Sequence, residues 1–451
     1  MNISNTSITS TFITALPFQF YNEATISLLF LSIYLCEQLF SKVFFTSPLL
    51  GQLFAGIVLG PACLNLISHP EAFRFIGKLG VMLLVLESGM ATDIKRVVDF
   101  GGRSFCAAFA GTISPVLIAV AGGVVFFQAD VRVGLAAGSA IAPTSLGFSA
   151  KLLGIEGLKT KLGSIIAISA VIDDVLSLCL LEIVRALATA NSTWDYIHPV
   201  VASLGSIVIG LCVVFTMQKC NVIHRTVKCI KSINNTHSDS EVQDSIYLLL
   251  LLFLSISLGW GCAAVGSSDL LGLFLAGLSF SKSSQTKNVF KKHFSKFTKV
   301  GTSLFFACTI GFGVPSLVNG SGLFSSEAAS RGLMLFVAAL VGKAVPLGFF
   351  AVPLSTLTFF KFAIAMQGRG EFSFYIAETA KTEGVLNQEW HAGVIWAVFL
   401  ASFVAPFGFR YVLSLETKQE KKKKNKKKSH GNQEGAEKVV LEEVEIEMKN
   451  K

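Results

Sequence analysis

The amino-acid sequence predicts an all-α polytopic membrane protein with about thirteen transmembrane helices. Of its 451 residues, 52% are hydrophobic and only 15% are charged, whereas a soluble globular protein carries about 25% charged residues. Long apolar runs recur from residue 24 to residue 413, each near the roughly 20 residues that a helix needs to cross a bilayer. Transmembrane strands are excluded, because the runs are too long and lack a period-two alternation.

Charged and Gly/Pro-rich breaks divide the apolar region into its helices. The predicted helices span residues 24–45, 48–67, 73–92, 101–128, 132–153, 160–188, 196–218, 244–265, 268–282, 296–315, 329–354, 357–383 and 390–413. An odd number of spans places the two termini on opposite sides of the membrane. Lysine and arginine concentrate in the loops on the side of the C-terminal tail, which the positive-inside rule makes cytoplasmic. Residues 1–23 are then extracytoplasmic, and residues 414–451 form a cytoplasmic, Lys-rich charged tail.

The tail contains the run KQEKKKKNKKK at 418–428, and the chain has a formal net charge of +9. Nucleic-acid binding is one interpretation of such a run. After the last apolar segment, however, a solvated tail that touches anionic lipid is the better one, so we expect membrane lipid and no nucleic acid as a partner. The nine cysteines form no CxxC pair, and we expect no cofactor.

The stretch AVIDDVLSL (170–178) places Asp173 and Asp174 side by side, as the only charges between residues 162 and 181. A carboxylate at a helix centre costs about 2.5–3.5 kcal/mol on insertion scales. Such a pair can hold a proton at one moment and a monovalent metal cation at another, because hard oxygen ligands suit an alkali ion such as Na⁺. The alternatives are a misplaced helix end, or a buried pair with purely structural partners.

Two further stretches interrupt apolar spans. GSAIAPTSLGFSAKLLG (138–154) contains Pro143, Thr144 and Ser145, and MQGRGEFSFYIAE (366–378) contains Arg369 between two glycines, with Glu371 after them. Both predict discontinuous helices, whose free carbonyls and hydroxyls can ligate a cation. Their corresponding positions indicate inverted repeats made of helices 2–6 and 9–13. For the first stretch, an ordinary proline kink is the alternative.

Lys343 is the single basic residue in LFVAALVGKAVPLGFFAV (335–352). A lysine inside an apolar span needs a partner, and Asp173 or Asp174 would serve. Cation binding to the carboxylates would weaken that pair and let the lysine lose its proton. The alternative is a lysine that snorkels from a displaced helix end.

Together these motifs resemble the monovalent cation/proton antiporters with a paired-aspartate motif. The resemblance rests on LVLESGMATD (84–93), APTSLGFSAKLLG (142–154), AVIDDVLSL, Gly342–Lys343 and RGEFSF (369–374), and it covers residues 24 to 413. It implies a transmembrane exchanger domain with a dimerisation part and a mobile core, whose helices lie at 73–188 and 296–383. Two broken helices cross in that core beside the aspartates. It also implies a homodimer, elevator-like movement, and exchange of two protons for one sodium ion.

The resemblance assigns roles by motif position. Asp174 would be the main cation and proton carboxylate, and Asp173 would pair with Lys343. The other residues that it assigns are Thr144 and Ser145 at the first crossover, Arg369 and Glu371 as charge partners at the second, and Glu87 as the family's helix-3 glutamate.

The sequence therefore predicts a Na⁺/H⁺ antiporter, with Li⁺ as a further candidate cation, and not an enzyme, in a plasma membrane or an organelle membrane. A K⁺/H⁺ antiporter is the alternative within the same class. A gated ion channel or an organic-anion symporter of similar fold are alternatives from other classes. A channel would favour a continuous pore, and a symporter would not need a tandem aspartate with a lysine.

Overall fold

The computed structural model describes residues 18–44, 46–67, 70–189, 192–220, 222–223, 225–227, 240–314, 322–350 and 356–449, and every regular element within these ranges is a helix. In chain order the elements are α2 (Phe18–Gln38), η1 (Leu39–Val43), α3 (Pro48–Leu59), α4 (Pro70–Ala91), α5 (Ile94–Phe127), α6 (Val131–Ile141), α7 (Leu146–Lys159), α8 (Lys161–Thr189), α9 (Thr193–Lys219), α11 (Ser240–Ala264), α12 (Asp269–Ser279), α13 (Ser284–Leu304), η2 (Phe305–Gly311), α14 (Ser326–Phe350), α15 (Thr356–Ala365), α16 (Glu371–Thr382) and α17 (Gln388–Lys449).

The all-α prediction is confirmed, and each of the thirteen predicted segments corresponds to a helix, a helix with a π-helical continuation, or two half-helices. Seven helices in the described ranges are long and apolar enough to cross a membrane on length and composition alone. The remaining helices fall outside this criterion of length and composition. The sequence has candidate N-glycosylation sequons (Asn-X-Ser/Thr), and these lie outside the described residues, at Asn2, Asn5, Asn191, Asn234 and Asn319.

Several helix boundaries differ from the sequence prediction, among them the starts of α5 and α13 and the end of α17. α5 begins at Ile94 and not at 101, and α13 begins at Ser284 and not at 296. Each start has a polar N-cap: Asp93 accepts a hydrogen bond from Lys95 N, and Ser283 accepts one from Thr286 N. Hydropathy does not detect these polar first turns, although they complete the helix ends. α17 continues through the charged tail to Lys449, where lysine, glutamate and glutamine are good helix formers.

Both predicted interruptions are confirmed as breaks between half-helices. α6 ends at Ile141, and α7 begins after Ser145, whose Oγ accepts a hydrogen bond from Phe148 N at 3.3 Å. Pro143 lies between them and has no N–H to continue a helix. In the second break, residues 366–370 separate α15 from α16, and Gly370 is extended at the start of α16.

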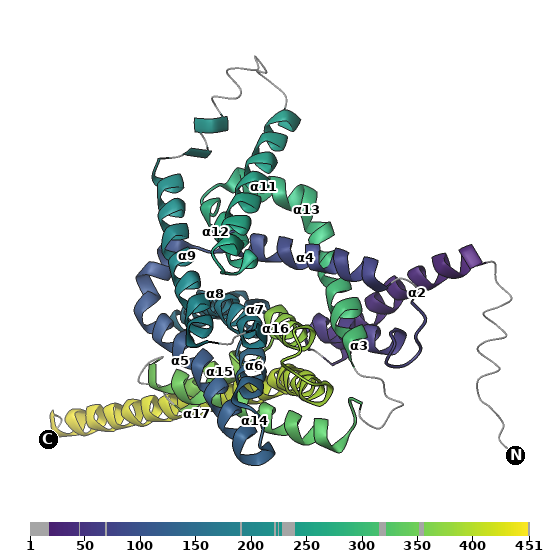
Figure 1. Cartoon of the computed structure of the whole chain (residues 1–451). Coiled ribbons are helices and arrows are strands. Elements are labelled where there is room, and N and C mark those ends of the chain that lie inside the picture. The colour runs from purple at the N-terminus through teal and green to yellow at the C-terminus, as the bar shows by residue number, and fades with distance from the viewer. Residues whose placement is uncertain are drawn as a thin grey trace, which may run out of the picture.

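The helices form two groups by their packing. In the first, which we call the central group, α14 packs against α5 and α17, while α5 packs against α6 and α8. In the second, the flanking group, α4 packs against α12 and α13, and α12 also packs against α9 and α11. Figure 1 shows α4 and α11–α13 above α5–α8 and α14–α17, with α2 and α3 to one side. α8, the helix of the two aspartates, contacts both groups, because it also packs against α9 and α12.

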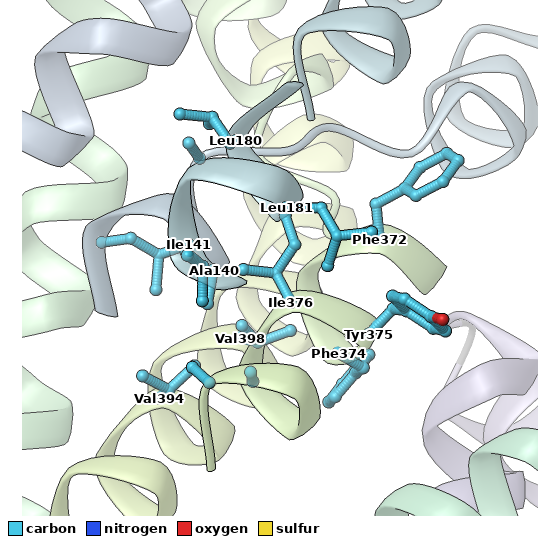
Figure 2. Close-up of a cluster of buried hydrophobic side chains, with 14 of the residues drawn as sticks. Ala140, Ile141, Leu180, Leu181, Phe372, Phe374, Tyr375, Ile376, Val394 and Val398 are labelled. Atoms are coloured by element: carbon cyan, nitrogen blue, oxygen red, sulfur yellow. The ribbon is translucent and has the colours of Figure 1, made fainter. Parts of the chain in front are cut away.

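A buried apolar cluster holds α8 against one half-helix from each break. Among its side chains are those of α6, α8, α16 and α17, which Figure 2 shows converging around α16. They include Ala140, Ile141, Leu180, Leu181, Phe372, Phe374, Tyr375, Ile376, Val394 and Val398. Burying each large side chain contributes about 1.5–3 kcal/mol in water, but less between helices in lipid, where close packing does the work. The cluster therefore fixes the position of the aspartate helix relative to both breaks.

Candidate ion-binding site

Two adjacent carboxylates on α8 have different surroundings. Asp173 is fully buried, and its Oδ2 lies 2.7 Å from Lys343 Nζ on α14, which is also fully buried. The hydroxyl of Thr112 on α5 donates a hydrogen bond to Asp173 Oδ1. Asp174 is 5% exposed, and among the described residues its carboxylate has no hydrogen-bond or ion-pair partner. The pair is therefore asymmetric: one charge is compensated and the other is not.

The asymmetry follows from helix geometry. Neighbouring residues on an α-helix point about 100° apart, so Asp173 can face α5 and α14 while Asp174 faces elsewhere. The charged groups close enough to act on Asp174 are Glu371, Asp173 and Lys343. Glu371 is the first residue of α16. Asp174 therefore lies within electrostatic range of the residue that begins α16, just after the second break.

The two breaks are in direct contact with each other. Ser145 N donates a hydrogen bond to Gly368 O at 2.9 Å, and Thr144 Oγ1 donates one to Met366 O at 3.2 Å. A Cβ added to Gly370 would lie 2.7 Å from Ser145 Cβ, closer than real side chains allow. The non-helical peptides of both breaks therefore cross at a point where only glycine fits.

Arg369 lies at this crossing and is only 1% exposed. Its guanidinium donates hydrogen bonds to Pro143 O at 3.3 Å and to Met366 O at 3.4 Å, and also to Ala339 O at 3.1 Å. Pro143 O and Met366 O lie just beyond the C-terminal ends of α6 and α15. The carbonyl ends of helices are negative, so one cation compensates the ends of both half-helices.

The crossing thus brings together seven of the eight residues proposed from the sequence. Those seven are Thr144, Ser145, Asp173, Asp174, Lys343, Arg369 and Glu371. Glu87 is the exception: it lies on α4 in the flanking group, and the charge that acts on it is Lys291 of α13. No contact among the described residues joins Glu87 to the aspartates.

Three polar groups of the central group were not anticipated from the sequence. Thr112 bonds to Asp173, Ser402 Oγ accepts from Arg369 N at 3.0 Å, and Ser149 Oγ donates to Ala365 O at 2.7 Å. A hydroxyl on an apolar helix does not by itself predict a partner on another helix, because it often donates to a carbonyl of its own helix. Thr112 Oγ1 itself also lies 2.9 Å from Ala108 O.

A second charged cluster, also unanticipated, lies where α8 meets α12. Arg185 Nη1 is 2.6 Å from Glu182 Oε1 on the same helix and 3.7 Å from Asp269 Oδ1 at the start of α12. The i, i+3 spacing of Glu182 and Arg185 was visible in the sequence, but the contribution of Asp269 depends on the fold. This cluster joins the central group to the flanking group.

The oxygen donors at the crossing suit a small hard cation. Carboxylate, hydroxyl and carbonyl oxygens bind alkali ions, whereas zinc and copper prefer imidazole and thiolate. In the described part of the chain, no group of three or more His, Cys, Asp or Glu side chains could hold a metal ion. A monovalent cation at Asp174 would be a substrate and not a resident cofactor.

Comparison with known proteins agrees with this geometry. The family described as "Sodium/hydrogen exchanger, transmembrane" matches residues 26–415. The chain is 23% identical over 412 residues to the high-affinity Na⁺/H⁺ antiporter NhaS3 of Synechocystis sp., covering 83% of this chain and 86% of that one. It is 26% identical over 378 residues to the Na⁺/H⁺-K⁺ antiporter GerN of Bacillus cereus, covering 82% and 91%.

The fold is also that of a solved antiporter. The structure of the sodium proton antiporter MjNhaP1 from Methanocaldococcus jannaschii at pH 8 superposes with a TM-score of 0.61, at 16% identity, over 87% of this chain and 99% of that one. The family match spans most of the chain, including both breaks and the paired aspartates. The chain therefore belongs to the sodium/hydrogen exchanger family of transmembrane proteins.

Proposed function

We propose that this protein exchanges Na⁺ for H⁺ across a membrane, and that both ions compete for the carboxylate of Asp174. The observation that carries the proposal is the asymmetry of the aspartate pair. Asp173 is compensated by Lys343 at 2.7 Å, whereas Asp174 is buried without a partner among the described residues. A buried, unpaired carboxylate costs several kcal/mol. Either a proton or a sodium ion removes that cost, so the site favours an occupied state.

Competition for one carboxylate is sufficient to couple the two fluxes. If the occupied, neutral site crosses from one side to the other more readily than the empty, charged site, then each passage carries either Na⁺ or H⁺. Movement in one direction with Na⁺ then requires a return with H⁺. The crossing of two broken helices gives the ion access to backbone carbonyls at mid-membrane, as in other transporters built from inverted repeats.

Lys343 has a second part in the proposal. Its pairing keeps Asp173 charged and in place, and cation binding beside the pair would weaken that interaction and release the lysine proton. Lys343→Ala should shift the pH profile of exchange and change its electrogenicity. An unchanged profile together with unchanged electrogenicity would refute a role for Lys343 in the cycle.

For the moving parts, we propose that the central group shifts against the flanking group in an elevator-like manner. The packing supports a core made of α5–α8 and α14–α17, because α14 packs on α5 and α17 while α4 packs on α12 and α13. The resemblance implied core helices at 73–188 and 296–383. The core proposed from the packing adds α17 and leaves α4 and α13 with the flanking helices. A homodimer and a cytoplasmic C-terminal tail belong to the same proposal.

The test is exchange in proteoliposomes that contain a pH-sensitive dye, with imposed gradients of Na⁺, Li⁺ or K⁺. The wild-type protein should alkalinise or acidify the lumen according to the direction of the Na⁺ gradient, and Asp174→Asn should abolish the response. Glu156→Gln is the matched control, because Glu156 is an exposed carboxylate paired only with Lys159. Normal exchange by Asp174→Asn would show that the carrier site is elsewhere.

K⁺/H⁺ exchange is the second candidate, favoured by one specific observation. GerN, which the chain matches over most of both lengths, is described as a Na⁺/H⁺-K⁺ antiporter. Equal dye responses to K⁺ and Na⁺ gradients would support this alternative. A response that requires no counter-ion would instead indicate a channel, and a response that depends on an organic anion would indicate a symporter. We propose a transporter and not an enzyme.

A further inference from the structure

Three lysines line one cavity at the junction between the central and flanking groups. The cavity has a volume of about 750 Å³ and lies between the α4–α5 connection and the α12–α13 connection. Its polar lining comprises Thr92, Asp93, Lys95, Ser281, Lys282 and Lys287. Lys95 is in the first turn of α5, and Lys287 is in the first turn of α13.

These lysines differ from their neighbours on α13 in lacking carboxylate partners. Lys292 Nζ is 3.0 Å from Asp244 Oδ2, Lys299 Nζ is 3.6 Å from Glu37 Oε1, and Lys291 lies near Glu87. Within the described ranges, by contrast, none of the three cavity lysines forms an ion pair.

The one carboxylate in the cavity is already engaged. Asp93 Oδ1 accepts a hydrogen bond from Lys95 N as the N-cap of α5. Among the described lining residues, three lysines and one aspartate leave a net charge of +2. Ile94, the first residue of α5, also lines the cavity, so the positive N-terminal end of that helix adds to the field. The charge of the lining therefore favours an anion.

The position of the cavity in the membrane identifies the anion. α4 ends at Ala91 and α12 ends at Ser279, so the cavity lies where two apolar helices leave the bilayer, on the side of the Lys-rich loops. Its lining also contains apolar Ala91 and Ile94, and the described lining residues include no aromatic side chain that could stack a nucleotide base. Basic pockets at helix ends on this side of a membrane recognise anionic lipid headgroups.

We propose that this cavity binds the phosphate headgroup of an anionic phospholipid from the adjacent leaflet. Lys282 and Lys287 of the flanking group and Lys95 of the central group would hold the phosphate together. Because its ligands come from both groups, a bound headgroup would bridge the parts that the exchange cycle moves. Binding itself does not depend on the exchange activity proposed above, so it can be tested separately.

The test is native mass spectrometry of the detergent-purified protein titrated with phosphatidylglycerol and, separately, with phosphatidylcholine. Lys282→Gln/Lys287→Gln removes two cavity lysines. Each lysine near an anionic surface contributes about 1 kcal/mol, so phosphatidylglycerol affinity should fall about thirtyfold. Lys292→Gln/Lys296→Gln is the matched control: it removes the same charge from α13 outside the cavity, and binding should remain near wild type.

Three outcomes would overturn the proposal. The first is equal loss in both double variants, which would indicate general attraction and not a site. The second is wild-type affinity for phosphatidylglycerol no greater than for phosphatidylcholine. The third is full displacement of the lipid by millimolar inorganic phosphate, which would identify a soluble-anion site. Lys282→Arg/Lys287→Arg should retain binding, and this separates loss of the site from misfolding.

Discussion

Replacing Arg369 tests whether the crossing of the broken helices depends on one buried guanidinium. Arg369→Met removes every donor while keeping a side chain of similar length. The carbonyls of Pro143, Met366 and Ala339 then lose a donor inside the protein. Interhelical hydrogen bonds in membrane proteins contribute about 0.6 kcal/mol on average and at most about 1.7 kcal/mol. Three such losses predict a destabilisation of about 2–5 kcal/mol.

Arg369→Lys separates charge from geometry. A lysine keeps the positive charge near the C-terminal ends of α6 and α15, but its single nitrogen cannot reproduce the planar fork that reaches carbonyls in both breaks and on α14. We therefore expect about half the destabilisation of Arg369→Met. Arg74→Met is the control, because Arg74 is partly exposed and paired with Glu71 at 2.8 Å, and surface pairs contribute about 0–1 kcal/mol.

The assay is reversible unfolding in mixed micelles, followed by helical circular dichroism, for the wild type and the three variants. The expected order of stability is wild type and Arg74→Met, then Arg369→Lys, then Arg369→Met. Wild-type stability of Arg369→Met would refute the reasoning altogether. Full stability of Arg369→Lys would show that charge alone is sufficient and that the hydrogen-bond geometry is unimportant.

Two further substitutions probe the same region. Gly368→Ala should lower the yield of folded protein, measured by size-exclusion chromatography, because the new Cβ would overlap the ring of Phe148; a wild-type profile would show that the crossing can relax. Thr112→Val should lower the unfolding free energy by about 1–2 kcal/mol, because Asp173 loses a donor, whereas Thr112→Ser keeps the donor. Exchange should persist in both variants, since Thr112 does not contact Asp174. Abolished exchange in the folded Thr112→Val variant would contradict the assignment of Asp174 as the carrier.

The sequence predicted the breaks and the buried charges because polar groups are rare in apolar helices. Pro143 and the glycines around Arg369 cannot continue a regular helix within lipid without cost. A lysine at position 343 requires a partner for the same reason. These constraints are local or involve a few groups, so a single sequence reveals them.

The remaining features depend on contacts between distant segments. Arg369 bonds to carbonyls in both breaks and on α14, and a backbone carbonyl leaves no trace in the sequence. Thr112 could have been satisfied by its own helix, so its bond to Asp173 was not predictable. Glu87 is the opposite case: the motif match named it together with the aspartates, and in the structure the charge that acts on it is Lys291 of α13.

The charges at the crossing limit the possible stoichiometry. With Asp173, Asp174, Glu371, Lys343 and Arg369 all ionised, the crossing has a net charge of −1. One Na⁺ or one proton cancels this charge, so competition at a single carboxylate gives one-for-one exchange. A second proton per cycle requires Lys343 to lose its proton while Na⁺ is bound, which would disrupt its pairing with Asp173. The reversal potential of exchange, which measures stoichiometry, therefore reports whether the Lys343–Asp173 pair opens during transport.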